Sequence, residues 1–469
     1  MEDSYERKID VKLILSIVAT GLMSFTGVVI ETAMNITFPT LMKEFQVDTS
    51  TVQWITTGYL LVLAIVIPIS SFLKKQFTTK SLFLIAILLF ITGTILDAMA
   101  PTFKLLLLGR IIQAVGTGIA LPLMFNIVLE QVPLDKLGMM MGVASLITAI
   151  APAIGPSLGG MIINLFGWRM IFIVLIPLLI IAFFMGLFSI RQVKPTEKTK
   201  FDWYGYIFLV ICFASFIFGT SLAGTVGWFS IKVIGLFVVS IITLAIFYKH
   251  SEKIEIPIIN INVFHNYSFS FSVVVLILVQ FICLGLGFLI PNYSQIVSGE
   301  NAFTAGLLLL PGCILGAMMT PISGRILDMF GAKKPILLGN ISIIFATLCY
   351  SIFAKNMTSL LFITFYIFFA FGQGFSVGNT MTNGLRGLHE NLKADGNAVF
   401  NTLQQLAGAI GTSIITTIVA TSQGKMPNNL AISTMLGSRN AFVLLCALAF
   451  ITVVCSLCVF HFKEIEKLN

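Results

Sequence analysis

The chain has 469 residues, of which 57% are hydrophobic and only 10% are charged, with a formal net charge of +8. A soluble protein of this length would carry about 25% charged residues, so the composition excludes a soluble globular fold. Fourteen apolar stretches are each close to or above the roughly 20 residues that a helix needs to cross a bilayer. They lie at 13–38, 52–72, 81–100, 105–129, 137–163, 169–189, 204–222, 231–248, 268–293, 303–322, 335–353, 359–385, 396–422 and 440–460. The sequence therefore predicts an all-α, polytopic membrane protein with fourteen transmembrane helices.

The spacing of these stretches predicts three parts. Polar connections near 190–203 and 249–267 separate six stretches from two, and two from six. We expect an N-terminal six-helix bundle over 1–189, a central two-helix insertion with its connectors over 190–267, and a C-terminal six-helix bundle over 268–469. Two six-helix bundles related by pseudo-symmetry are a common transporter plan. The two central stretches carry no intramembrane charge, so we expect them to face lipid and to line no substrate path.

Lysine and arginine are distributed unequally between the two sides. With a cytoplasmic N-terminus, 20 of the 28 basic residues fall inside and 7 outside, and Arg110 lies within a stretch. The positive-inside rule then predicts that both termini are cytoplasmic. The net charge reflects topology and contact with anionic lipid, and no connection resembles a basic domain for nucleic acid. The excess of Lys over Arg, 21 to 7, is typical of an AT-rich bacterial genome, which favours a bacterial plasma membrane.

One face of the first stretch is small and polar and includes an acid. Thr20, Ser24, Gly27, Glu31 and Asn35 recur at intervals of three or four residues, so they share one helix face. We expect this face to look into a cavity or the bundle interior. A charge at the depth of Glu31 costs at least ~2.5 kcal/mol, and such acids are functional by default. Glu31 is therefore a candidate proton carrier; the alternative is a structural carboxyl satisfied by a hydrogen bond.

The fourth stretch contains Arg110, the only cation inside a predicted span and away from its first two residues. Gln113 and Thr117 continue its helix face. An arginine in the membrane must be paired or hydrated, and we expect Glu31 to be its partner, directly or through water. The alternative is an arginine whose side chain extends to the outer interface.

Other polar residues in the spans are less specific. Asp97 and Glu130 lie at span ends, where we expect water to reach them. Several hydroxyls and amides either line a polar path or hold helices together. The candidates for a substrate cavity are Ser24, Asn35, Gln113, Thr117, Asn292, Gln295, Asn379, Asn383, Asn401 and Gln404.

Catalytic motifs are absent or misplaced. Residues 155–159 match the pattern GxSxG, but they lie in a Pro-rich membrane stretch and not on a strand–turn–helix elbow. The chain has no HExxH motif, no P-loop and only four His residues. We therefore expect no enzyme activity, no cofactor and no metal. A membrane-embedded hydrolase that uses Ser157 is the alternative from another class.

Several runs resemble motifs of the major facilitator superfamily. Residues 151–160 resemble its antiporter motif, gxxxGPxxGG, with Ala151 in place of the first glycine. Residues 31–39, 110–116 and 401–405 resemble signatures of the first, fourth and thirteenth helices of the fourteen-helix drug:proton antiporter family, which includes lincomycin-exporter-like proteins. The antiporter-motif residues are Pro152, Gly155, Pro156, Gly159 and Gly160.

Two positions depart from the family pattern. Many relatives have an Asp one position before Glu31, where this chain has Ile30. The family's loop motif, GxLaDRxGRK, is nearly erased after the second stretch and is better kept after the tenth. The resemblance implies a cytoplasmic gate loop there, made of Gly324, Asp328, Gly331 and Lys333.

The resemblance implies a major facilitator fold and a proton-coupled antiporter with Glu31 as proton carrier. Such a protein would export amphipathic, cationic or zwitterionic drugs across the bacterial plasma membrane by alternating access. Its partners would be protons, small amphipathic molecules and the lipid bilayer, and we expect a monomer. A dedicated exporter of one metabolite, amino acid or lipid remains an alternative, as does a receptor that does not transport.

Overall fold

The computed structural model describes residues 9–468 except 48, 53, 194, 198, 199, 255, 256, 301 and 427. The described residues form α-helices and short 3-10 helices, and they contain no strand. In chain order the elements are α1 (Val11–Phe45), α2 (Thr49–Val52), α3 (Trp54–Val66), η1 (Ile67–Ile69), α4 (Ser70–Gln76), α5 (Thr79–Ala98), α6 (Phe103–Gln131), η2 (Leu134–Lys136), α7 (Leu137–Phe166), α8 (Arg169–Ser189), α9 (Trp203–Val226), α10 (Ile231–Lys253), η3 (Ile261–His265), α11 (Tyr267–Ile296), α12 (Ala302–Leu307), α13 (Leu310–Phe330), α14 (Lys333–Phe353), α15 (Ser359–Arg386), η4 (Glu390–Leu392), α16 (Lys393–Lys425) and α17 (Leu430–Leu468).

Fourteen helical spans within the described residues are long and apolar enough to cross a membrane, which confirms the predicted all-α membrane fold. The second span, Trp54–Gln76, combines α3, η1 and α4. It changes to a 3-10 turn at Ile67–Ile69 because Pro68 has no backbone N–H to continue the α-helix. The tenth span, Phe303–Phe330, likewise joins α12 to α13.

Polar side chains begin many of the spans. At each of these helix starts a side-chain oxygen accepts a hydrogen bond from a backbone N–H of the first turn, which has no partner within the helix. The residues that cap a span in this way are Asp10, Thr78, Thr102, Asp202, Asn266 and Thr358. The polar connections therefore determine where these apolar helices start.

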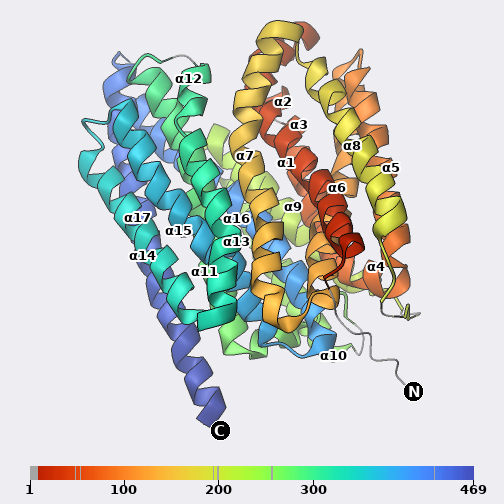
Figure 1. The fold of residues 1–469 in the computed structure, drawn as a ribbon. Helices are drawn as coiled ribbons and strands as arrows, with labels where there is room; N and C mark the ends of the chain where they lie inside the picture. Colours follow the sequence, from red (N-terminus) through yellow and green to blue (C-terminus); the bar gives the residue numbers. More distant parts are fainter. Residues whose placement is uncertain are drawn as a thin grey trace, which may run out of the picture.

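Both ends of the chain lie on the same side of the molecule, because fourteen spans are an even number. Figure 1 shows this side at the bottom, where α1 begins and α17 ends. We call it the terminal side and the other end the opposite side. The connections that precede α5, α7, α9, α11, α14 and α16 lie on the terminal side.

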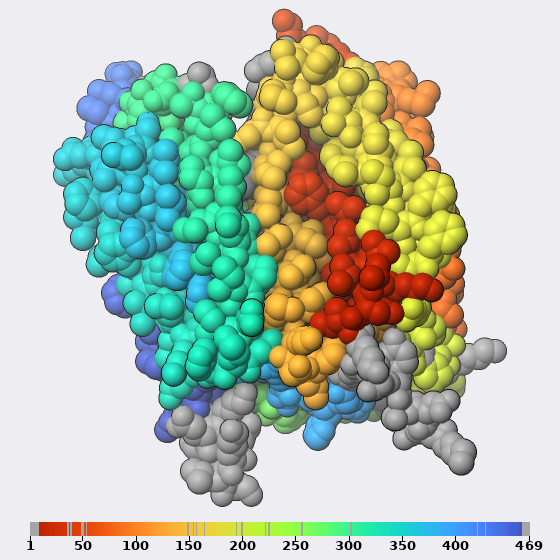
Figure 2. All heavy atoms as spheres, in the orientation of Figure 1, coloured from red at the N-terminus to blue at the C-terminus, as the bar shows by residue number. Residues whose placement is uncertain are grey.

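Two groups of helices stand side by side, with α7 and α13 along their contact (Figure 1). Small residues let these two helices approach closely. A Cβ atom added at Gly138 would lie 2.7 Å from the Gly324 oxygen, and one at Gly142 would lie 2.6 Å from the Thr320 oxygen. Figure 2 shows α13 lying directly against α7. The division into a six-helix bundle, an insertion and a second six-helix bundle stays a prediction.

The helices of the central insertion have different surroundings. Large apolar side chains of α10, such as Ile231 and Ile241, are exposed, as expected of a helix that faces lipid. Helix α9 instead contacts both α3 and α16. The ring of Trp54 lies 4.6 Å from that of Phe218, and the Ser413 hydroxyl donates to the Thr220 oxygen over 2.9 Å. Helix α9 therefore packs against an early span, through α3, and a late span, through α16.

Candidate functional site

Arg110 is buried among the first six spans and is 0% exposed. Its Nη1 donates to Gln113 Oε1 over 2.8 Å, and its Nε donates to the Ile55 oxygen over 3.5 Å. The guanidinium carbon lies 4.1 Å from the centre of the Tyr59 ring, in cation–π range. The alternative in which Arg110 extends to the outer interface is therefore wrong.

Hydrogen bonds around Arg110 connect four helices. Gln113, on α6, donates through Nε2 to Thr94 on α5 over 2.9 Å. The Tyr59 hydroxyl, on α3, donates to Thr117 Oγ1 at 2.8 Å and to the Gly27 oxygen of α1 at 3.3 Å. Gln113 and Thr117 both have hydrogen-bond partners, so they are held in place and do not face open space. Tyr59 was not among the predicted residues, because a single tyrosine in an apolar span has no sequence signature.

Glu31 lies one helical turn after Gly27 on the same face of α1, and it is half-buried. The hydrogen bonds of Arg110 go to Ile55 and Gln113, so the expected direct pair with Glu31 is not made in this conformation. The charge of Arg110 nevertheless acts on Glu31 electrostatically. Glu31 and Arg110 are therefore within electrostatic range of each other but share no hydrogen bond.

The rest of that α1 face points into the protein. Thr20 and Ser24 are buried, and each hydroxyl donates to a carbonyl one turn earlier over 2.9 Å. Their polar groups are thereby satisfied within α1 itself. The side chain of Asn35, the last predicted member of this face, lies outside the described side chains.

The structure corrects the expectation that Asp97 and Glu130 are solvated. Asp97 is 0% exposed, and its carboxylate lies against the Cα of Gly109. Glu130 is also buried and pairs with Lys74 of α4. Both acids lie at the ends of their spans in sequence, but residues of neighbouring helices, Gly109 of α6 and Lys74 of α4, pack against them.

The antiporter-motif glycines pack α7 against α1 beside Glu31. A Cβ atom at Gly155 would collide with the Thr32 side chain, and one at Gly159 would lie 2.9 Å from the Ala33 Cβ. Gly160 faces open space, with nothing within 4 Å of such an atom. Pro152 is half-buried, whereas the side chain of Pro156 lies outside the described side chains.

Among the predicted amides of the later spans, Asn379 and Asn383 bond to a neighbouring helix, whereas Asn401 and Gln295 bond within their own. Asn379 donates to Phe375 and Ser323 oxygens, Asn383 donates to Ser268, and Asn401 donates to Asn397. Gln295 is exposed and donates to its own helix, and Asn292 is half-buried.

One amide pair remains partly accessible. Gln404 of α16 donates to Gln280 of α11 over 3.2 Å, and both side chains are half-buried. Of the predicted amides in the later spans, Gln404 therefore keeps the best geometry for lining a substrate path.

The predicted gate loop joins the two helix groups on the terminal side. Asp328, near the end of α13, accepts 3.0 Å hydrogen bonds from the backbone N–H groups of Gly138 and Met139 at the start of α7. Arg386 of α15 donates to Asp328 over 2.6 Å and to the Leu134 oxygen over 3.0 Å. An acid at a helix N-terminus satisfies unpaired N–H groups and complements the helix dipole.

The other residues of that loop shape the turn. Gly324 is the close-contact partner of Gly138, and Lys333 begins α14. Gly331 ends α13 with φ of 81°, a left-handed conformation that glycine adopts without strain.

A second contact joins the two groups where the first-half loop motif is erased, and its acid lies at the start of a helix. Asp395, in the first turn of α16, interacts with the Ser71 side chain and with the charge of Lys75, both on α4. Nearby, Asn397 donates to the Pro122 oxygen over 3.0 Å and to Asn126 Oδ1 over 2.8 Å. In the Asp328 contact the acid is near the end of a span and meets the start of a helix, whereas here the acid Asp395 is at the start of a helix and the cation Lys75 is at the end of a span. Together with Asp328, these contacts close the terminal side between the two helix groups.

On the opposite side, Glu44 holds the end of α1 to the start of α8. It accepts hydrogen bonds of 2.7 Å from Trp168 Nε1 and from Arg169 Nη1. Burial alone would raise the pKa of Glu44, but these hydrogen bonds and the Arg169 charge hold the pKa below its usual range. Arg169 also donates to the Ala100 oxygen, so three connections meet at this corner.

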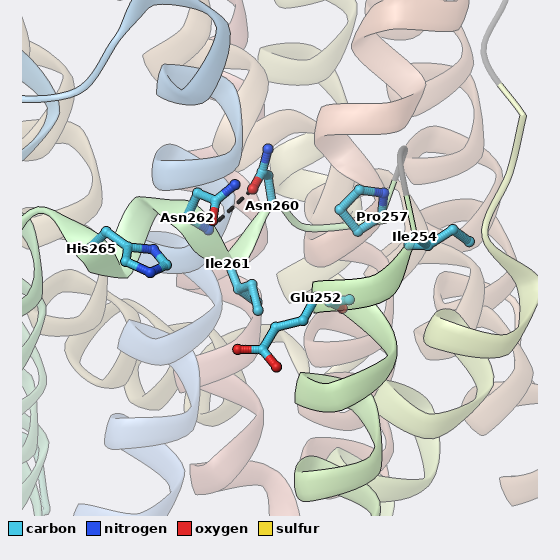
Figure 3. Close-up of a pocket in the computed structure, with 8 residues that line it drawn as sticks. Glu252, Ile254, Pro257, Asn260, Ile261, Asn262 and His265 are labelled. Atoms are coloured by element: carbon cyan, nitrogen blue, oxygen red, sulfur yellow. Dashed lines mark hydrogen bonds between the residues drawn. The ribbon is translucent and has the colours of Figure 1, made fainter.

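A cavity of about 320 Å³ lies on the terminal side, between the end of α10 and η3. Figure 3 shows the Glu252 carboxylate on one wall, with Asn262 and His265 on another. None of the predicted site residues lines it. The cavity is therefore separate from the Arg110 network.

A family model described as Major Facilitator Superfamily matches residues 19–412. Lincomycin resistance protein LmrB of Listeria monocytogenes is 36% identical over 452 residues, which cover 94% of this chain and 96% of that protein. The chain belongs to the major facilitator superfamily. Multidrug resistance protein B homolog of Mycobacterium tuberculosis is 28% identical over 421 residues, 89% of this chain and 78% of that protein.

A solved major facilitator structure has the same fold. The crystal structure of the human organic anion transporter MFSD10 (TETRAN) superposes with a TM-score of 0.66 at 11% identity, covering 95% of this chain and 99% of that chain. Superfamily membership makes this protein a multi-pass membrane transporter and not an enzyme. The hydrolase alternative is thus wrong: Ser157 lies within the continuous helix α7.

Proposed function

We propose that the protein is a proton-coupled antiporter that exports amphipathic drugs, cationic or zwitterionic, by alternating access. Glu31 is the proton carrier. The observation that carries this proposal is the Arg110 centre, in which one buried guanidinium interacts electrostatically with Glu31. The hydrogen-bond network around that guanidinium ties α1, α3, α5 and α6 together. A change of charge at Glu31 therefore acts on four helices at once.

Exchange of proton for drug follows from the charge of Glu31. An ionised Glu31 attracts Arg110 and a cationic drug, whereas a protonated Glu31 attracts neither strongly. Either ligand can drive transport only if it favours a different access state. Gly155 and Gly159 bring α7 to within contact of α1 beside Glu31. A shift of α1 is thus passed to α7, which lies at the boundary between the two helix groups.

The substrate class is inferred from chemistry near the site and from relatives. Glu31 offers a negative charge, and the half-buried Gln280–Gln404 pair offers amide donors and acceptors. Such a combination suits an amphipathic molecule with a cationic or zwitterionic group. Relatives carry names that refer to lincomycin resistance and multidrug resistance.

The same proposal sets the orientation in the membrane. Counted along the sequence, 20 basic residues belong to the side of the chain ends and 7 to the other, so the terminal side is cytoplasmic by the positive-inside rule. The membrane is the bacterial plasma membrane. Both helix groups belong to one chain, and a monomer is sufficient.

The test is drug-driven proton flux in reconstituted vesicles, measured with a trapped pH dye against a panel of lincomycin and cationic dyes. Wild type should exchange protons for several of these compounds. Glu31→Gln keeps size and hydrogen bonding but cannot titrate, so it should lose the coupled flux while remaining folded. Glu31→Asp should keep part of it, and Asp135→Asn, an exposed acid of the terminal side, should keep all of it.

Other outcomes of the vesicle assay would contradict parts of the proposal. Coupled flux at the wild-type rate in Glu31→Gln would exclude Glu31 as the carrier. Drug export by wild type without proton movement would exclude the antiport mechanism. Export of one compound from the panel would favour a dedicated exporter.

A further inference from the structure

Asp97 is a buried acid that the proposed mechanism does not use. It lies one residue before the end of α5, on the opposite side of the molecule, and it is 0% exposed. Neither carboxyl oxygen has a hydrogen-bond partner among the described residues. Its carboxyl group instead packs against the Cα of Gly109, the residue before Arg110. Few buried acids in folded proteins lack every partner.

Arg110 is the cation that faces Asp97. Helix α5 packs mainly against α6 and α8. Helix α6 brings Arg110 into electrostatic range of Asp97, and Tyr59 of α3 is also within this range. Helix α8 brings Arg169, whose guanidinium is already bonded to Glu44 and the Ala100 oxygen. Arg110 alone has a terminal nitrogen to spare, because its Nη2 has no hydrogen-bond partner in the described part of the chain.

Burial without hydrogen-bond partners determines the charge state of Asp97 in this conformation. An ionised carboxylate that is buried without hydrogen bonds loses its hydration, and the charge of Arg110, which forms no ion pair with it, offsets only part of that cost. Holding a proton costs less free energy than holding that charge. Asp97 is therefore neutral here, while one donor of Arg110 remains open.

We propose that Asp97 is a second proton-binding residue of the transport cycle and shares Arg110 with Glu31. When the opposite side opens, the Asp97 carboxylic acid gives its proton to water, and the carboxylate formed accepts a hydrogen bond from Arg110 Nη2. When a proton returns from that water to the carboxylate, Arg110 is released toward Glu31. One proton is exchanged in each direction, and no other reactant is needed.

The position of Asp97 fits this role. Met99, two residues later, is 73% exposed at the opposite side, and the polar residues Thr102 and Lys104 that follow are also exposed, so Asp97 lies near the surface of the protein on this side. Gly109 has no side chain between the carboxyl group and the backbone that holds Arg110.

Infrared spectroscopy of the purified protein tests the protonation without any transport. Wild type should show a protonated-carboxyl C=O band that disappears as pH is raised. Asp97→Asn should lose that band, Asp97→Glu should shift it, and the matched control Asp135→Asn should leave it unchanged. An identical band in Asp97→Asn would overturn the proposal. If Asp97→Asn does not fold, an unshifted band in Asp97→Glu would overturn it equally.

The proton-to-drug ratio tests the exchange, and this part rests on the proposed antiport function. The ratio is obtained in vesicles from the drug gradient at which net flux reverses. It should fall by one proton in Asp97→Asn and stay at the wild-type value in Asp97→Glu. An unchanged ratio in Asp97→Asn would overturn the proposal. Absence of proton flux in wild type would instead reject the antiport function, and the infrared band would still decide whether Asp97 holds a proton.

Discussion

Arg110 is at the centre of a group of buried polar residues within the first six spans, toward the opposite side of the molecule. Its guanidinium lies over the Tyr59 ring, donates to the Gln113 amide and is within electrostatic range of two acids, Glu31 and Asp97. A buried cation with several weak partners is easier to redirect than one held in a bidentate ion pair. The site therefore favours movement of a charge between partners over maximal stability.

The Tyr59 hydroxyl is the link between this centre and α1. Tyr59→Phe keeps the ring over Arg110 but removes the bonds to Thr117 and Gly27. We expect a loss of about 1 kcal/mol in unfolding free energy, because a buried carbonyl loses its extra donor. Thermal unfolding in detergent measures this loss.

The matched control for that change lies in the later spans. The Tyr350 hydroxyl donates to the Phe362 oxygen over 2.9 Å, far from Arg110. Tyr350→Phe should cost a similar amount of stability and leave the pH dependence of drug-driven proton flux unaltered. The pH dependence should shift in Tyr59→Phe, and identical profiles for the two variants would show that Tyr59 is only structural.

The Glu44 corner should make stability depend on pH. The folded-state pKa of Glu44 lies below its usual value, so its stabilising contribution is present above the unfolded pKa of about 4.3. The contribution is lost as pH falls through the lowered folded-state pKa. Wild type should therefore melt at a higher temperature than Glu44→Gln at pH 7, and the difference should shrink in acid. A pH-independent difference would mean that shape and not charge holds this corner.

Sequence analysis identifies candidate site residues mainly because charged residues are rare within apolar stretches, so it finds only the residues that are rarest there. Glu31 and Arg110 are conspicuous because each is a charge well inside an apolar stretch. Asp97 lies one residue from its helix end and looks solvated, since the sequence does not show that neighbouring helices cover it. Tyr59 has a common residue type, and only the fold places its hydroxyl against Gly27.

At the scale of elements, close helix contacts depend on glycines that face another backbone. Gly155→Ala places a methyl group into the Thr32 side chain, whereas Gly160→Ala places one in open space. Overpacking typically costs 1–3 kcal/mol, so we expect about that loss for Gly155→Ala and almost none for Gly160→Ala. Thermal unfolding of the two purified variants measures the difference. Equal losses would show that helix propensity and not the α1 contact decides the effect.

Hydropathy predicts the existence of spans better than their ends. The predicted stretch 440–460 becomes α17, which begins at Leu430, and the stretch 396–422 becomes α16, Lys393–Lys425. The additional residues mix polar with apolar side chains, and their backbone hydrogen bonds continue the helix beyond the most apolar part. Buried hydroxyls such as Ser433 bond to their own helix and are hidden from a hydropathy count.

At the scale of the whole molecule, the terminal side is closed by two contacts, one with its acid near the end of a span and the other with its acid at the start of a helix. On one flank, the acid Asp328 lies on α13 and binds the start of α7. On the other, the acid Asp395 lies at the start of α16 and faces Lys75 of α4. Alternating access requires both contacts to break before this side opens. The Asp395 contact preserves an attraction where the loop motif of the family is erased.

Asp328→Asn should weaken the first contact. The substitution keeps the shape of the side chain but removes the charge that Arg386 and the start of α7 complement. A loss of about 1.4 kcal/mol raises the population of the open state about tenfold. The readout is maleimide labelling from the terminal side at Ser145→Cys, a buried position of α7 that contacts Gly378.

Labelling at Ser145→Cys should be faster in the Asp328→Asn background than in the parent and unchanged in Asp135→Asn. Asp135 is an exposed acid in the same connection as Leu134, so it controls for a general change of charge at that surface. The native cysteines set the background rate, which is measured without Ser145→Cys. A parent-like rate in Asp328→Asn would mean that packing between α7 and α13 alone keeps the terminal side closed. The backbone approach at Gly138 and Gly324, which carries no charge, would then be the element that transport has to separate.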